Sequence, residues 1–101
     1  MAYKVVLRSG AVADLKSIFT WVAEEADLTT ALAYDRRIRE ACRKLADFPG
    51  RGTPRDLLIP GLRSVAFERR ATIYYLIGEK SVRIVRILSA GQDPAWAFKV
   101  G

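Results

Sequence analysis

Residues 61–88 read GLRSVAFERRATIYYLIGEKSVRIVRIL. Three runs of apolar, β-branched and aromatic residues are separated here by two short polar stretches, Arg69-Arg70 and Gly78-Glu79-Lys80. Consecutive runs joined by such short connections are typical of antiparallel strands. The segment therefore predicts a three-stranded antiparallel meander, with strands at 62–68, 72–77 and 82–88.

The middle strand, Thr72-Ile73-Tyr74-Tyr75-Leu76-Ile77, is apolar or aromatic at positions that point to both faces of a sheet. A strand of this kind is covered on both sides, because successive side chains point to opposite faces. One layer of helices covers only one face. We expect a partner chain to cover the other face, since a chain of 101 residues offers little else.

Helical periodicity fills most of the first half of the chain. Apolar residues recur at helical spacing over 10–26 and again over 30–47, and Pro49-Gly50 ends the second stretch. Two adjacent helices with one apolar stripe each predict an antiparallel hairpin packed on one face of the sheet. The expected N-caps are Ser9 for the first helix and Thr29 or Thr30 for the second.

The remaining segments complete the expected fold. Residues 3–7 form a short β-branched strand, 51–60 a loop with an extended piece at 57–59, and Asp93-Pro94 begins a short helix or tail on the sheet. The element order is β-α-α-β-β-β with a short C-terminal helix or tail. This is an α+β fold in a single domain, 1–101. The expected core contains Leu15, Ile18, Phe19, Val22, Ile38, Leu45, Ile73, Val85 and Ile87.

Composition limits the chemistry that the chain can perform. It has no histidine and a single cysteine, Cys42, so it lacks the commonest general base and cannot form an internal disulfide or a multi-thiolate metal site. We expect no metal and no cofactor. No apolar run is long enough to cross a bilayer, and residues 1–4 carry no apolar signal core, so a cytoplasmic protein is expected.

The charge of the chain points to an anionic partner. Most of the net charge of +6 falls after residue 50, in the loop and the meander, and arginine outnumbers lysine. Arginine favours planar, bidentate contacts with carboxylates and phosphates. The charge distribution is consistent with binding to an acidic protein or a polyanion, and also with a generally basic, solvated surface.

The order of these segments resembles the ParE/RelE superfamily of bacterial type II toxins. The local matches are Ala13-Asp14-Leu15-x-x-Ile18, Phe48-Pro49-Gly50-Arg51-Gly52, Gly61-Leu62-Arg63, Tyr75, and Val85-Arg86-Ile87-Leu88 with Asp93 shortly after. The resemblance covers essentially the whole chain. It implies a small toxin held in a hetero-oligomeric complex by a ParD-like antitoxin, which has a ribbon-helix-helix head and an amphipathic C-terminal segment. Any DNA contact would then be indirect, through that complex.

Two activities occur on this scaffold, and the resemblance to the ParE-like branch implies poisoning of DNA gyrase, which is not an enzymatic activity of the toxin. The alternative is a RelE-type, ribosome-dependent mRNA endoribonuclease, which moves protons during attack by a ribose 2′-hydroxyl. This chain offers Arg51 and Arg55 where such nucleases concentrate lysines, and Ser89 where they often place histidine or tyrosine. Arginine cannot serve as a general acid or base, so no catalytic residue is assigned. A plain nucleic-acid-binding module is a third possibility, but the aromatic residues alternate with aliphatic ones rather than forming a stacking platform.

The resemblance and the charge pattern name two sets of binding residues. The candidates for target binding are Arg51, Arg55, Arg63, Arg86, Trp96 and Phe98. The candidates for antitoxin binding are Arg36, Arg39, Arg43, Tyr74 and Arg83.

Several of these residues have a structural alternative. Trp96 and Phe98 could hold the tail on the sheet, and at least one of Tyr74 and Tyr75 is expected in the core. Trp21 is expected to pack along the hairpin. Glu68 is expected to pair with Arg69 or Arg70.

Overall fold

The computed structural model describes residues 3–99. Strand β1 (Lys4–Leu7) leads into helices α1 (Ser9–Glu25) and α2 (Leu28–Lys44). A 3-10 turn, η1 (Pro49–Arg51), and a two-residue strand, β2 (Thr53–Pro54), precede the meander β3 (Arg63–Phe67), β4 (Ala71–Ile77) and β5 (Ser81–Ser89). The short helix α3 (Pro94–Ala97) follows. The predicted order of elements is confirmed, and the extended piece lies at β2 rather than at 57–59, where the chain turns.

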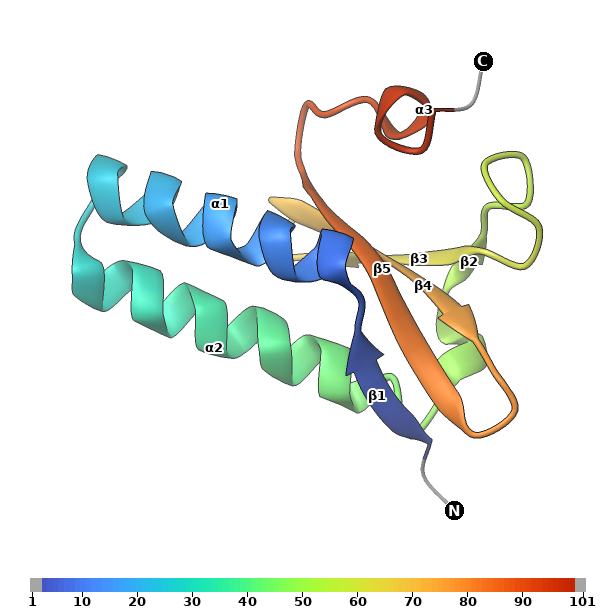
Figure 1. The fold of residues 1–101 in the computed structure, drawn as a ribbon. Helices are drawn as coiled ribbons and strands as arrows, with labels where there is room; N and C mark the ends of the chain where they lie inside the picture. Colours follow the sequence, from blue (N-terminus) through green and yellow to red (C-terminus); the bar gives the residue numbers. More distant parts are fainter. Residues whose placement is uncertain (1–2, 100–101) are drawn as a thin grey trace.

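The five strands form one mixed sheet in the order β1-β5-β4-β3-β2. The meander is antiparallel as predicted, whereas β1 pairs with β5 in parallel, with Val5 opposite Val82. A parallel neighbour requires a crossover connection, because the chain must return to the end of the sheet from which it started. Here the helical hairpin belongs to that connection and lies against the sheet (Figure 1).

The helix caps differ from those predicted. The cap of α2 is Asp27, whose carboxylate accepts a hydrogen bond from the backbone nitrogen of Thr30 at 2.7 Å. The cap position of α1 is Arg8, which makes no side-chain capping bond, and Ser9 is the first helical residue. Asp27 stands where the apolar stripe of the first helix ends, and a short acceptor three residues before a free backbone N–H is a strong cap.

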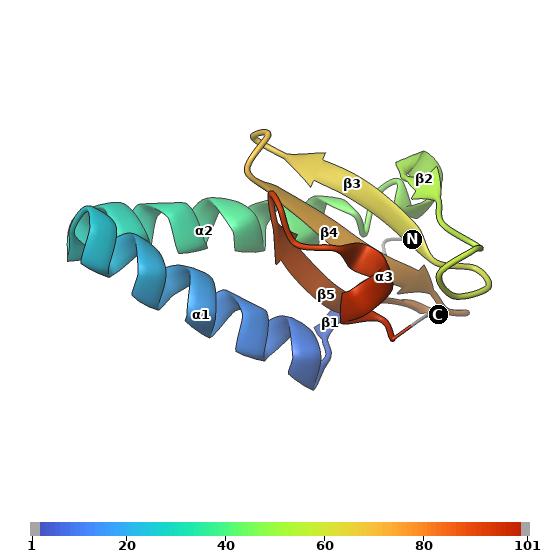
Figure 2. The same cartoon turned by 90° about the horizontal axis from the view of Figure 1, so that it is seen from above.

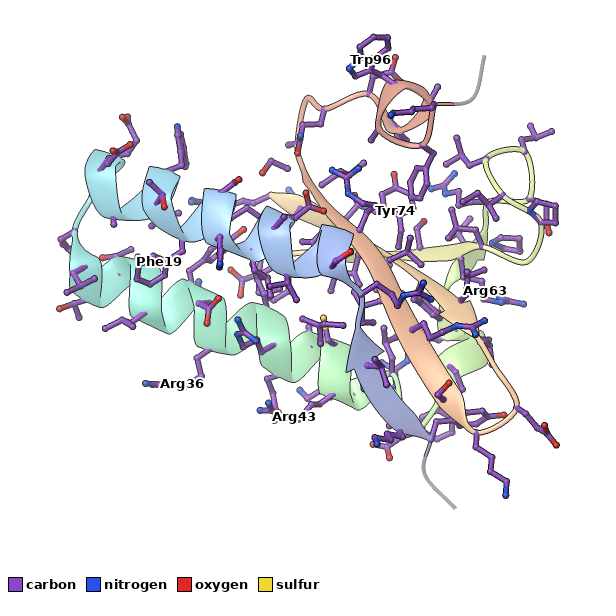
Figure 3. The ribbon with its side chains drawn as sticks, in the orientation of Figure 1. Phe19, Arg36, Arg43, Arg63, Tyr74 and Trp96 are labelled. Carbon is purple, nitrogen blue, oxygen red and sulfur yellow. The ribbon has the colours of Figure 1, made fainter. Side chains whose placement is uncertain are left out.

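The main core lies between the helical hairpin and one face of the sheet. Five of the residues predicted to be buried are buried in it: Leu15, Ile38, Leu45, Ile73 and Ile87. Ile18, Val22 and Val85 are partly buried and pack against the clusters. Phe19 belongs to neither cluster, so that prediction was wrong. The hairpin extends past the end of the sheet, and Phe19 lies on this overhanging part, where no third layer covers it (Figures 1 and 3).

The second face of the sheet carries a smaller cluster of its own, formed by Leu62, Tyr74 and Leu88. Its cover comes from this chain: Leu58 and Ile59 of the loop before β3, and Ala97 and Phe98 at α3. Figure 2 shows α3 lying across the sheet on the side away from the hairpin. The expectation of a partner chain on this face is therefore corrected, since the loop and the C-terminal segment already cover it.

A β-bulge in β5 explains how this strand contributes to both clusters. The register with β4 shifts between Tyr74 and Tyr75, which pair with Arg86 and Ile84 and leave Val85 as the extra residue. Ile84 and Ile87 consequently face the helices, although strict alternation would put them on opposite faces.

Candidate binding surfaces

The loop that follows α2 is attached to the sheet by Tyr75. Its hydroxyl donates a hydrogen bond to the carbonyl oxygen of Pro49 at 2.6 Å and accepts one from the backbone nitrogen of Gly52 at 3.0 Å. Burial raises the pKa of Tyr75 above its ordinary value of 10, against smaller opposing effects of the Gly52 bond and two nearby arginines. Tyr75 is thus a neutral structural group near pH 7.

Arg63 attaches the same loop from β3. Its Nη1 donates to the carbonyl oxygens of Gly50 and Gly52 at 3.0 and 2.6 Å. The backbone of residues 49–52 is therefore held by Tyr75 and Arg63 together. Arg63 was predicted to contact a target, and in the structure its guanidinium group instead donates hydrogen bonds to the loop backbone of the same chain.

Phe48 and Arg51, at the start of this loop, are among its solvent-exposed side chains. Phe48 is 69% exposed, and the guanidinium carbon of Arg51 lies 5.6 Å from the centre of its ring. Arg55 is also exposed, although its Nε donates to the hydroxyl of Ser64 at 2.8 Å. An aromatic ring and an arginine presented by a preorganised loop are common in protein interfaces. Phe48 was not among the predicted site residues.

Arg86 connects three elements. Its Nε and Nη2 donate to the two carboxylate oxygens of Asp14 in α1, each at 2.8 Å, and its Nη1 donates to the carbonyl oxygen of Ala97 in α3 at 3.1 Å. Asp14 also accepts a hydrogen bond from the backbone nitrogen of Ile87, on the edge of β5 that has no strand neighbour once β1 has ended. Asp14 raises the pKa of Arg86, mainly through this hydrogen bonding. Arg86 therefore positions the hairpin and the C-terminal helix against β5.

The two aromatic residues of the C-terminal segment lie in opposite environments. Trp96 is 83% exposed and points away from the molecule (Figure 3), whereas Phe98 packs edge-on against Tyr74 with a centroid distance of 5.2 Å. Tyr74 is only 5% exposed. Direct contact between Tyr74 and an antitoxin would require α3 to move away, while Trp96 is available as it stands.

The outer surface of α2 carries the other predicted antitoxin contacts. Arg39 is paired with Asp35 at 2.9 Å and Arg43 with Glu40, whereas Arg36 makes no ion pair within residues 3–99. Figure 3 shows Arg36 and Arg43 pointing outward. Arg83 lies on β5, and its Nε is buried without a hydrogen-bond partner among the described residues.

A cleft of about 820 Å³ opens between the overhanging part of the hairpin and the end of the sheet. Residues of α1, α2, the β3–β4 turn and the end of β5 line it, including Trp21, Tyr34, Arg37, Arg69, Arg70 and Arg86. Only Arg86 belongs to the predicted site. Trp21 is 63% exposed here, so the expectation that it packs along the hairpin was wrong. Glu68 pairs with Arg37 of α2, not with its neighbours Arg69 and Arg70.

Two features limit the chemistry of the described residues. Burial raises the pKa of the Cys42 thiol to about 11, so this cysteine is no nucleophile near neutral pH. Within residues 3–99 no group of three His, Cys, Asp or Glu side chains is placed to hold a metal ion. No helix in the same range is long and apolar enough to span a membrane.

A family model and a curated relative both match this chain to ParE toxins. Residues 5–94 match the model of a family described as the ParE toxin of the type II toxin–antitoxin system parDE. The chain is 37% identical to Toxin ParE3 of Caulobacter vibrioides over 82 residues, which is 81% of each sequence.

Two solved structures share the fold. A chain of the chromosomal ParDE system of P. aeruginosa has a TM-score of 0.77 at 24% identity, covering 87% of this chain and 96% of that one. A chain of the toxin–antitoxin complex RelBE2 of Mycobacterium tuberculosis has a TM-score of 0.59 at 20% identity, covering 88% and 99%. At these identities the likeness concerns the fold alone.

Proposed function

Because this chain belongs to the ParE toxin family of type II toxin–antitoxin systems, we propose that it arrests growth by binding DNA gyrase and trapping the enzyme on cleaved DNA. The toxin supplies a binding surface and moves no proton. Candidate contacts are the exposed side chains of Phe48 and Arg51 on the rigid loop, Arg55 beside them, and Trp96 on α3.

One observation favours this activity over the RelE-type endoribonuclease. The basic and tyrosine groups that the nuclease would use are engaged in internal hydrogen bonds: Tyr75 and Arg63 with the loop backbone, and Arg86 with Asp14 and Ala97. The pKa of Tyr75 is raised by burial, away from the neutral range in which general acid–base catalysis is efficient. The ParE family match supports the same choice.

The proposed partner before toxin release is a ParD-like antitoxin. Its ribbon-helix-helix head would bind DNA, so the toxin would reach DNA only through the complex, and its amphipathic C-terminal segment would cover the toxin. The relatives in solved structures are named as parts of ParDE and RelBE2 systems. The toxin would act in the cytoplasm, where both the antitoxin and gyrase are found.

Two assays on the purified protein test the target. With gyrase and plasmid DNA, we expect linear cleavage product to accumulate with toxin concentration, and Trp96→Ala to reduce this accumulation. With programmed ribosomes, we expect mRNA to stay intact. mRNA cut at ribosomal A sites, without linear plasmid, would replace the gyrase proposal with the endoribonuclease.

A third test concerns the antitoxin. Co-expression of the adjacent short reading frame should restore growth and yield a complex that co-purifies. The proposal also predicts that DNA-damage signalling precedes any fall in translation after the toxin alone is induced.

A further inference from the structure

The second face of the sheet is covered only in part. The loop before β3 and the segment around α3 pack over Leu62, Tyr74 and Leu88, which belong to the β3–β4 side and to the end of β5. Strand β1 forms the opposite edge of the sheet and lies well away from α3 (Figure 1). Val6 of β1 is 37% exposed although it is a large apolar residue in a strand. The part of this face that β1 provides is therefore open to solvent.

The exposed residues of β1 place two cations on the open face. Val5 and Leu7 pack against the core beneath the helices, so the residues that alternate with them point to the opposite face. These are Lys4, Val6 and Arg8, and all three are exposed. Arg8 follows the strand directly and keeps an extended backbone, with φ −77° and ψ 163°. Neighbours on one face of a strand are about 6–7 Å apart, so a cation lies on each side of Val6.

A third cation comes from β5. Val82 and Ile84 are buried beneath the helices, which turns Arg83 between them to the open face. The strand register places Arg83 next to Val6 of β1. We call Lys4, Arg8 and Arg83 the basic face of the sheet. None of the three forms an ion pair within residues 3–99.

The basic face lowers the stability of the fold. Arg8 stands at the N-cap of α1, where a short acceptor stabilises a helix and a cation opposes the helix dipole. The first turn of α1 has no acidic residue to offset this charge. The Nε of Arg83 is buried without a hydrogen-bond partner among the described residues, which costs desolvation energy. Residues that conflict with folding in this way gather at functional sites.

We propose that the basic face contacts the phosphate backbone of the duplex DNA that gyrase holds. This inference rests on the proposed function, because a toxin bound to the trapped enzyme lies next to DNA. Before release the DNA contact is indirect, through the antitoxin, and the direct contact forms on gyrase. Lysine and arginine hold phosphates without reading the base sequence. A phosphate beside Arg8 also supplies the negative charge that the start of α1 lacks.

Two other partners fit the basic face less well. Protein interfaces are anchored by aromatic and other large side chains that fill pockets, and Val6 is the one exposed large apolar residue in β1 and β5. Single-stranded nucleic acid stacks its bases on aromatic rings, and neither strand contains an aromatic residue. Evenly spaced cations on an open sheet face match the regular phosphates of a duplex backbone.

The salt dependence of duplex binding measures these contacts. A short fluorescein-labelled DNA duplex of mixed sequence is titrated with purified toxin, and its anisotropy is followed from about 50 to about 200 mM salt. Lys4→Gln, Arg8→Gln and Arg83→Gln should each lower the slope of log K against log salt by about 1, and the triple variant by about 3. Arg36→Gln removes the same charge from the outer surface of α2 (Figure 3), so it should change the slope far less.

Stability measurements separate a loss of binding from a loss of folding. The triple variant removes three neighbouring cations, one of them at a helix N-cap, so its urea midpoint should equal or exceed that of the wild type. Arg8→Lys combined with Arg83→Lys keeps the charge and should leave the slope within about 0.5 of the wild-type value. If the triple variant does not fold, Lys4→Gln at an exposed position of β1 carries the test alone.

The cleavage assay tests the contact on gyrase itself. The triple variant should bind gyrase as tightly as the wild type when DNA is absent, and should accumulate about tenfold less linear plasmid when DNA is present. Weaker binding to gyrase without DNA would assign the basic face to a protein surface and overturn the DNA contact. An unchanged salt slope would overturn it as well, and so would an RNA duplex that binds much more tightly than the DNA duplex.

The failure of this inference differs from the failure of the proposed function. If the wild type and the triple variant trap gyrase equally, the proposed function stands and the DNA contact is wrong. If the wild type traps no gyrase while the salt slope falls as expected, the proposed function fails and the basic face is still a DNA-binding surface.

Discussion

The hydroxyl of Tyr75 occupies the space that a side chain on Gly52 would need. A Cβ at position 52 would collide with this oxygen and lie 2.9 Å from the carbonyl oxygen of Ser64. The loop between α2 and β3 can therefore approach the sheet closely only with glycine at this point. This contact fixes the backbone that presents Phe48 and Arg51.

The first prediction follows from this close contact between Gly52 and the Tyr75 hydroxyl. Gly52→Ala should lower the free energy of unfolding by about 1–3 kcal/mol, because the added methyl forces the loop off the sheet. Gly50→Ala is the matched control, since a Cβ there meets nothing within 4 Å. Urea denaturation of the two variants measures the difference. Equal midpoints would mean that the loop is not held as described.

Removal of the Tyr75 hydroxyl should lower the stability of the protein without abolishing growth arrest. Tyr75→Phe leaves the Pro49 carbonyl and the Gly52 nitrogen without their partner, which should cost about 1–3 kcal/mol of stability. Growth arrest at low temperature should change little, because the hydroxyl moves no proton. A variant of normal stability that no longer arrests growth would favour the endoribonuclease.

The position of Phe19 predicts a small effect of truncating it. Phe19→Ala should cost about 1 kcal/mol, since the ring lies outside both core clusters. Ile38→Ala, at a fully buried position of α2, should cost about 2–5 kcal/mol. Chemical denaturation of both proteins tests the contrast. A larger loss for Phe19→Ala than for Ile38→Ala would contradict the described packing.

The pair between Arg37 and Glu68 should appear in the pH dependence of stability. Hydrogen bonding to Arg37 is the main reason that the pKa of Glu68 lies below its ordinary value of 4.5. The stabilisation is present above that value and is lost as the pH falls through the lowered folded-state pKa. Glu68→Gln should therefore flatten the loss of stability below about pH 5, measured as urea midpoints over a pH series. An unchanged pH profile would show that the pair adds no stability.

The two aromatic residues near the C-terminus should behave oppositely. Trp96→Ala should leave stability within about 0.5 kcal/mol of wild type and weaken growth arrest, because the exposed indole can contact the target. Phe98→Ala should lose about 1–3 kcal/mol, since its ring covers Tyr74. Thermal unfolding and a growth assay distinguish the two. Full toxicity of Trp96→Ala would remove this residue from the target surface.

The order of elements followed from the sequence because hydrophobic period and turn residues are local signals. The predicted helix boundaries were close, but the cap of α2 is Asp27 rather than Thr29 or Thr30. The parallel pairing of β1 with β5 depends on the three-dimensional path of the hairpin, which no local pattern encodes. The bulge at Val85 was visible only as an irregular alternation.

The candidate site was harder to predict, because the exposure of a side chain depends on which distant segments of the chain fold over it. Arg63 and Arg86 are typical interface residues in sequence, yet their guanidinium groups bond to carbonyls and a carboxylate distant in the chain. The cleft collects residues from four elements, so no single motif contains it. One signal was available: Glu68-Arg69 occupies a tight hairpin turn without asparagine or glycine, which indicates a constraint from elsewhere.

The interior position of β5 in the sheet has a consequence for synthesis on the ribosome. This strand lies between β1 and β4 and supplies Ile87 and Ser89 to the cleft, yet it follows all the other strands in the chain. A nascent chain that ends before residue 81 can form the hairpin and the β3–β4 pair but lacks the strand that connects β1 to β4. Translation must therefore pass β5 before the five-stranded sheet and the cleft beside it can form.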